Sequence, residues 1–243
     1  MQGPEYEFAA DSYIMPFTKA SLKVAGEQSN IVLKFILYHE ICHILRGHLG
    51  LIYSKNGSEL QEAFQDESIL NINLRQTLEM DADSFAVNRI INSYLLFYSN
   101  IENHSDSIYQ TWETFIYNFS FSIYTFFRLF GFHHVEVEKI KKFPHPRPLT
   151  RIQMISENIA TILVAREIDN LDYLCEKIVD AQVDAEKELA KVTFFSNETK
   201  DFLLAVSSDE SRIYINKIMG NWNKLYDYLL PYTFGVLPNK NAF

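Results

Sequence analysis

Glycine and proline are scarce in this sequence. The 243 residues include 8 Gly and 7 Pro, well below the average usage of roughly 7% and 5%. Many short strands joined by tight turns would need more of both residues, so their scarcity favours helices. We predict a mainly α (α+β) fold. Its few short strands are expected near the N-terminus, where the apolar pieces Tyr13–Met15 and Leu22–Val24 lie.

Cysteine and positive charge are also in short supply. The two cysteines, Cys42 and Cys175, are too few for the disulfide framework of a small secreted domain, and no charged-then-apolar leader opens the chain. We therefore expect a cytoplasmic protein with reduced thiols. The 22 Lys and Arg against 31 Asp and Glu give a net charge of −9, and no basic run is present. This balance argues against a nucleic-acid partner.

The most apolar segment is too short to span a membrane. Residues 114–127 form an uncharged run of 14 residues, whereas a transmembrane helix needs about 20. The surrounding segment, residues 111–132, alternates partly as a strand would, but its length favours a helix. We predict a buried core helix here. A membrane-associated segment is the alternative that the sequence leaves open.

Apolar residues at three-to-four spacing predict the other helices. The first begins at Asn30 and ends near Gly47, and the second runs from about Ile69 to Tyr98. The remaining helices are expected at about residues 150–166, 171–192 and 198–230.

The first of these helices carries a candidate metal site. His39 and His43 are four residues apart, so on a helix both imidazoles can reach one metal ion. Glu40 follows His39 and can take a proton from water beside the metal. His48 lies one position short of the spacing of a third histidine ligand. We interpret His48 as a helix C-terminal residue, where a partly cationic imidazole suits the helix dipole.

A third ligand is expected on the second long helix. Glu79 and Asp83 stand one turn apart on one face, so one can bind the metal while the other accepts the spare N–H of a ligand histidine. Ala82 supplies a small side chain that lets two helices approach closely. Two acids at this spacing also commonly form a solvated edge, which is the alternative interpretation.

Taken together, the motifs resemble those of the gluzincin zinc endopeptidases. These enzymes combine His-Glu-x-x-His with a downstream Glu-x-x-x-Asp. In their HtpX-like and CAAX-prenyl-protease-like branch the second motif is Glu-x-x-Ala-Asp, which is also the sequence pattern of residues 79–83. The same branch has a His-Pro pair followed by Arg-Ile, matched here within residues 145–152. The HtpX-like and prenyl-protease branches carry transmembrane helices. This compact chain is also similar to the Lit-like phage-exclusion peptidases.

The resemblance implies a fold and a role for each residue. A zincin-like metallopeptidase core would cover residues 1–166, and a helical C-terminal extension, residues 167–243, would pack on it. Zn²⁺ would be bound by His39, His43 and Glu79, with Glu40 as general base, His145 helping to stabilise the oxyanion, Asp83 orienting a ligand histidine and Arg151 bracing a carboxylate.

The sequence therefore predicts a zinc-dependent endopeptidase that hydrolyses a protein or peptide substrate. The alternative is a catalytically silent regulatory or binding module that uses zinc for stability. Aromatic residues gather over Trp222–Tyr228, and aromatic groups dominate the energetics of protein interfaces. This C-terminal region is a candidate surface for a protein partner.

Overall fold

The fold was obtained as a computed structural model, which describes residues 18–54, 67–98, 109–130, 146, 148–191 and 209–240. Within these ranges the chain is mainly helical and contains no strand, so the mainly α class is confirmed. The short strand expected at Leu22–Val24 is wrong, because these residues lie within helix α1 (Lys19–Leu45). The other expected strand, Tyr13–Met15, falls outside the described residues.

Helix α1 begins at Lys19 rather than at the predicted Asn30. Its N-cap is Thr18, whose side-chain oxygen accepts a hydrogen bond from the Ser21 backbone N–H at 3.1 Å. Such a cap satisfies one of the backbone donors that have no partner in the first turn. Buried apolar contacts start only at Ile31, so the apolar pattern predicted the packed part of the helix but not its first turns.

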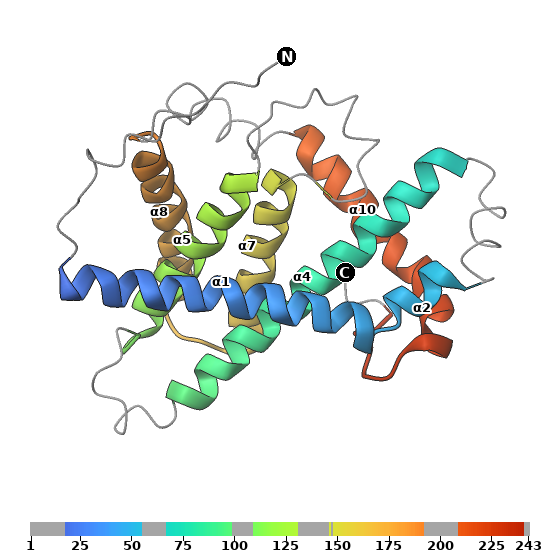
Figure 1. The fold of residues 1–243 in the computed structure, drawn as a ribbon, viewed down its shortest axis with the longest axis horizontal. Coiled ribbons are helices and arrows are strands. Elements are labelled where there is room, and N and C mark those ends of the chain that lie inside the picture. The colour runs from blue at the N-terminus through green and yellow to red at the C-terminus, as the bar shows by residue number, and fades with distance from the viewer. Residues whose placement is uncertain are drawn as a thin grey trace, which may run out of the picture.

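Two long helices cross at the centre of the molecule. Helix α4 (Glu67–Tyr98) runs diagonally across α1 in Figure 1. At their contact Cys42, Ala82 and Phe85 form a small buried cluster. Ala82 is fully buried, so its small side chain allows the close approach that the sequence predicted. Cys42 is likewise a buried core residue.

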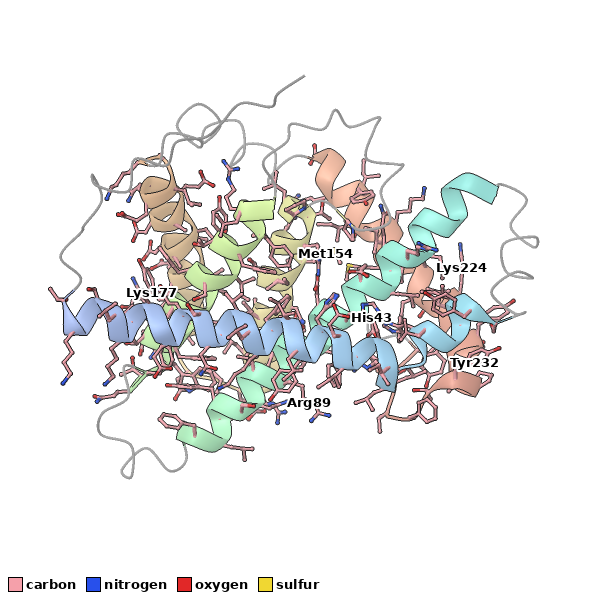
Figure 2. The ribbon with its side chains drawn as sticks, in the orientation of Figure 1. His43, Arg89, Met154, Lys177, Lys224 and Tyr232 are labelled. Atoms are coloured by element: carbon pink, nitrogen blue, oxygen red, sulfur yellow. The ribbon has the colours of Figure 1, made fainter. Side chains whose placement is uncertain are left out.

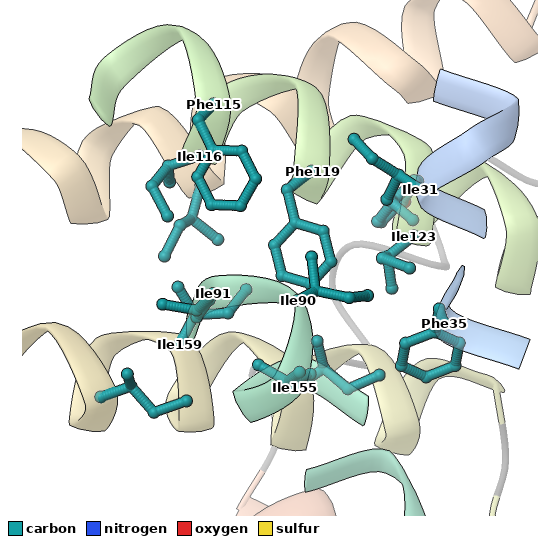
Figure 3. Close-up of a cluster of buried hydrophobic side chains, with 14 of the residues drawn as sticks. Ile31, Phe35, Ile90, Ile91, Phe115, Ile116, Phe119, Ile123, Ile155 and Ile159 are labelled. Carbon is teal, nitrogen blue, oxygen red and sulfur yellow. The ribbon is translucent and has the colours of Figure 1, made fainter. Parts of the chain in front are cut away.

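The main hydrophobic core lies where α1 and α4 meet three further helices. These are α5 (Trp112–Phe130), α7 (Pro148–Ala165) and α8 (Leu171–Leu189). Figure 3 shows Phe35 of α1, Ile90 of α4 and Phe119 of α5 facing one another in this core. The buried helix expected within residues 111–132 is therefore confirmed over Trp112–Phe130 as α5. None of the helices in the described part of the chain is long and apolar enough to cross a membrane.

Helix α8, from the predicted C-terminal extension, packs along α5. Its Leu174 and Ile178 belong to the same core as Phe119. The two helices also share a fully buried ion pair, in which Arg128 Nε donates to Glu186 Oε1 at 2.6 Å. The division of the chain at residue 166 stays a prediction.

A second cluster joins α4 to α10 (Asp209–Leu229) and to the short helix α2 (His48–Tyr53). Trp222 of α10 is fully buried in it. The expectation that this indole contributes to a partner surface is therefore wrong, because it fills a core position between helices. Tyr228, in the same aromatic region, remains 40% exposed.

The end of α1 is fixed by the C-terminal segment. The Leu45 carbonyl accepts hydrogen bonds from the backbone N–H groups of Phe234 and Gly235, at 2.8 and 3.0 Å. Gly47 then turns the chain into α2 with φ +76°, and a Cβ at this position would lie 2.6 Å from the carbonyl carbon of Tyr232. Figure 2 shows Tyr232 beside α2. Glycine is required here for conformation and for space.

Candidate metal centre

His39, His43 and Glu79 meet at the crossing of α1 and α4. Their side chains lie 9%, 12% and 10% exposed, so the group is nearly buried. The two Nε2 atoms are 3.2 Å apart, His39 Nε2 is 3.3 Å from Glu79 Oε2, and His43 Nε2 is 3.5 Å from Glu79 Oε1. Figure 2 places His43 where the two helices cross. These three side chains are grouped closely enough to hold one metal ion.

Asp83 and Arg151 support this group from the His39 side. His39 Nδ1 lies 3.0 Å from Asp83 Oδ1. Arg151, from α7, donates to both oxygens of the same carboxylate, through Nε at 2.8 Å and Nη2 at 2.6 Å. Its guanidinium also lies over the Phe127 ring, 4.5 Å from the centroid. A carboxylate held at both oxygens by arginine has little freedom to rotate, so His39 is held in one orientation.

The charges around His39 stabilise a cation at this point. Burial lowers the pKa of His39, but hydrogen bonds to Asp83 and Glu79 more than offset this and raise it to about 9. Burial and the neighbouring His48 lower the pKa of His43 to about 4, despite the nearby Glu79. Of the two histidines, His39 is therefore the one whose surroundings favour the protonated ring.

Glu40 lies one residue beyond His39 on the exposed surface of α1. Its negative charge affects the pKa of Arg151. Burial lowers the pKa of Arg151, but the carboxylates of Asp83, Glu79 and Glu40 together raise it above its ordinary value. Glu40 therefore interacts electrostatically with Arg151 while remaining open to solvent. His145, the expected oxyanion donor, lies outside the described residues.

His48 does not have the position expected of it. It opens α2 instead of closing α1, and its side chain is fully buried. Its Nδ1 lies 2.9 Å from His43 Nδ1, and its Nε2 lies 3.1 Å from Asp81 Oδ2. Arg46 forms an ion pair with the other Asp81 oxygen. The interpretation of His48 as a C-terminal residue of the first helix is wrong. Gly47 turns the chain, and the His48 ring therefore faces His43.

Sequence reasoning missed His48, Asp81 and Arg46 as a group. The available signal was a third histidine close to the first two and a third acid between Glu79 and Asp83. On a helix Asp81 points away from the face that Glu79 and Asp83 share, so spacing alone did not connect it with the histidines.

The comparisons with known proteins identify no relative. No family model matches the chain, and no curated protein and no solved structure matches it.

Proposed function

We propose that this protein is a zinc-dependent endopeptidase with a zincin-like metal site. The observation that carries the proposal is the grouping of two imidazole nitrogens and one carboxylate around one point, with the exposed Glu40 next to His39 in the sequence. Two imidazoles and a carboxylate are the protein ligands of many catalytic zinc sites, in which the fourth position stays open.

The spacing of the ligand side chains supports zinc. Two atoms at about 2.0 to 2.1 Å from a tetrahedral zinc ion are separated by about 3.3 to 3.4 Å. The two histidine Nε2 atoms are 3.2 Å apart, and each lies a similar distance from one oxygen of the Glu79 carboxylate, His39 Nε2 3.3 Å from Oε2 and His43 Nε2 3.5 Å from Oε1. Because each Nδ1 faces a partner outside the group, the Nε2 atoms are the ring atoms that would bind the ion, and the proton held by His39 would leave when zinc binds. The residues therefore fit the ion.

A bound zinc ion would supply a Lewis acid that activates water and polarises the substrate carbonyl. Glu40 would act at its carboxylate, accepting a proton from that water and returning it to the departing amine nitrogen. Asp83 would hold His39 through Nδ1, with Arg151 fixing the Asp83 carboxylate. His145 would donate to the developing oxyanion, as the resemblance implies.

The surface beside Glu40 suits a polypeptide. Leu37 and Ile44 precede and follow Glu40 by about one helical turn, and they are 56% and 57% exposed. An exposed apolar strip next to a charged side chain is typical of an interaction surface. A protein substrate with apolar side chains flanking the cleaved bond would cover this strip, which a small polar metabolite would not do.

The experiment combines two substitutions on purified protein. Glu40→Gln should keep one zinc per chain and abolish cleavage of protein substrates in a cell extract followed by mass spectrometry. Glu79→Ala should lose both zinc and cleavage. Full cleavage by Glu40→Gln would refute the role of the base, and unchanged zinc content in Glu79→Ala would remove that ligand.

One outcome favours the alternative function. A chain that binds one zinc through these residues, yet cleaves no protein with Glu40 intact, would be a zinc-stabilised binding module. Addition of a chelator to such a chain should then lower its melting temperature without changing any proteolysis.

A further inference from the structure

Each of the two ligand histidines is connected through Nδ1 to a buried carboxylate that an arginine neutralises. For His39 the connection is direct, to Asp83 and Arg151. For His43 it passes through the ring of His48 to Asp81, which pairs with Arg46. His48 and Asp81 are both fully buried, so water does not compete for these contacts.

We propose that Arg46, Asp81 and His48 form a positioning relay that holds His43 in the tautomer and orientation needed to bind the metal. The inference rests on the proposed metal site and assigns roles to three residues outside its ligand set. None of the three contacts the reacting atoms in this arrangement, so they are positioning residues and not catalytic ones.

The proton positions follow from the acceptor at the end of the relay. The Asp81 carboxylate only accepts, so His48 Nε2 carries the proton that faces it at 3.1 Å. A neutral His48 then has its lone pair on Nδ1, which accepts from His43 Nδ1 at 2.9 Å. His43 is left with a lone pair on Nε2, the atom that faces His39 and Glu79. The relay thus leaves the lone pair of His43 Nε2 directed at the metal position.

A second metal ion is the rival explanation of the same residues. Cys42, His48 and Asp81 also lie close enough together to hold an ion. However, Arg46 already forms a direct ion pair with the Asp81 carboxylate, whereas the guanidinium nearest Glu79, that of Arg151, lies 3.9 Å away. Burial, with the charge of Asp81, raises the pKa of the Cys42 thiol, which disfavours the thiolate that a metal requires. The geometry favours the relay.

The first test measures zinc affinity by competition with a chromophoric chelator. His48→Leu removes the relay and should weaken zinc binding by about 10- to 100-fold, the usual effect of losing a group that orients a ligand. His48→Gln keeps one acceptor and one donor and should recover much of that loss. Tyr124→Phe is the matched control, because it removes a buried hydroxyl that donates to Glu186 at 2.7 Å, on a different helix pair. Its zinc affinity should equal that of the wild type.

A second readout follows the protons directly. Nitrogen NMR of the zinc-loaded wild type, labelled with ¹⁵N-histidine, should show the ring proton on Nδ1 of His43 and on Nε2 of His48. A proton on Nδ1 of His48 would overturn the relay even if His48→Leu failed to fold. An unchanged zinc affinity in His48→Leu would also overturn the relay.

Metal counting separates the relay from its rival and from the proposed function. Wild type and Cys42→Ala should each bind one zinc. Two ions in the wild type, falling to one in Cys42→Ala, would assign these residues to a second metal site and overturn the relay. A wild-type chain that takes up no zinc would refute the proposed function and the relay together, whereas zinc binding insensitive to His48 refutes the relay alone.

Discussion

Replacing Asp83 by Asn tests how strongly the carboxylate that contacts His39 supports the proposed metal site. The change preserves side-chain size but removes the charge that Arg151 contacts at 2.6 and 2.8 Å. The Asp83 and Arg151 side chains are only 4% and 15% exposed. Removing one partner of a buried pair costs about 3 to 5 kcal/mol, and the partial exposure of Arg151 places the expected loss near the lower end, at about 3 kcal/mol.

Two measurements follow for Asp83→Asn. For a chain of this length, about 2 to 4 °C is lost per kcal/mol, so the metal-free variant should melt about 6 to 12 °C below the wild type. Zinc affinity, measured with a competing chelator, should fall about 10- to 100-fold, because the Asn amide holds the His39 Nδ1 proton less firmly. Glu188→Gln, which breaks a pair between two exposed side chains, should leave zinc affinity unchanged and the melting temperature nearly so.

A double variant separates stability from metal binding. Asp83→Asn with Arg151→Met no longer leaves a buried guanidinium facing an amide, so part of the lost stability should return. Zinc affinity should stay weak, because His39 still lacks its carboxylate. Wild-type zinc affinity in Asp83→Asn, or its recovery in the double variant, would refute the assigned role of Asp83.

Three further substitutions test the fold. Glu186→Gln should lower the free energy of unfolding by about 3 kcal/mol or more, because Arg128 is fully buried against this carboxylate; an unchanged urea midpoint would contradict this. Gly47→Ala should destabilise by about 1 to 2 kcal/mol from its left-handed φ of +76° alone, and further from the contact with Tyr232. Gly26→Ala, with open space around its Cβ, should instead raise the melting temperature; equal effects of the two alanines would refute the steric argument.

Local spacing predicted the parts of the site that lie on single helices. His39 and His43 on α1, and Glu79 and Asp83 on α4, are pairs one turn apart, and helical geometry alone places each pair on one face. Their convergence depends on how the two helices cross, which periodicity does not determine. The small residue Ala82 was the one local indication, and it lies at the crossing.

Features that depend on distant segments were not predictable in the same way. The first turns of α1 contribute little to the core, as the 56% exposed Leu22 illustrates, so an apolar pattern could not reveal them. Trp222 was assigned to a candidate partner surface because aromatic residues gather around it in the sequence, yet α10 buries it against α4. His48 acquired its position from a glycine turn that the C-terminal segment holds in place.

The arrangement of acids on α4 explains why this helix can organise the site. Counting backbone and side chain together, the residues Glu79, Asp81 and Asp83 are 8%, 0% and 2% exposed. Burying carboxylates is costly unless each one has a cation or a set of donors. Arg46 and Arg151 provide this for Asp81 and Asp83. Asp83 then contacts the imidazole of His39 on α1, and Asp81 contacts that of His48 on α2. The supporting groups come from α4, from α7 and from Arg46 directly after α1, so under the proposed function a metal ion would meet ligands that packed helices already hold in place.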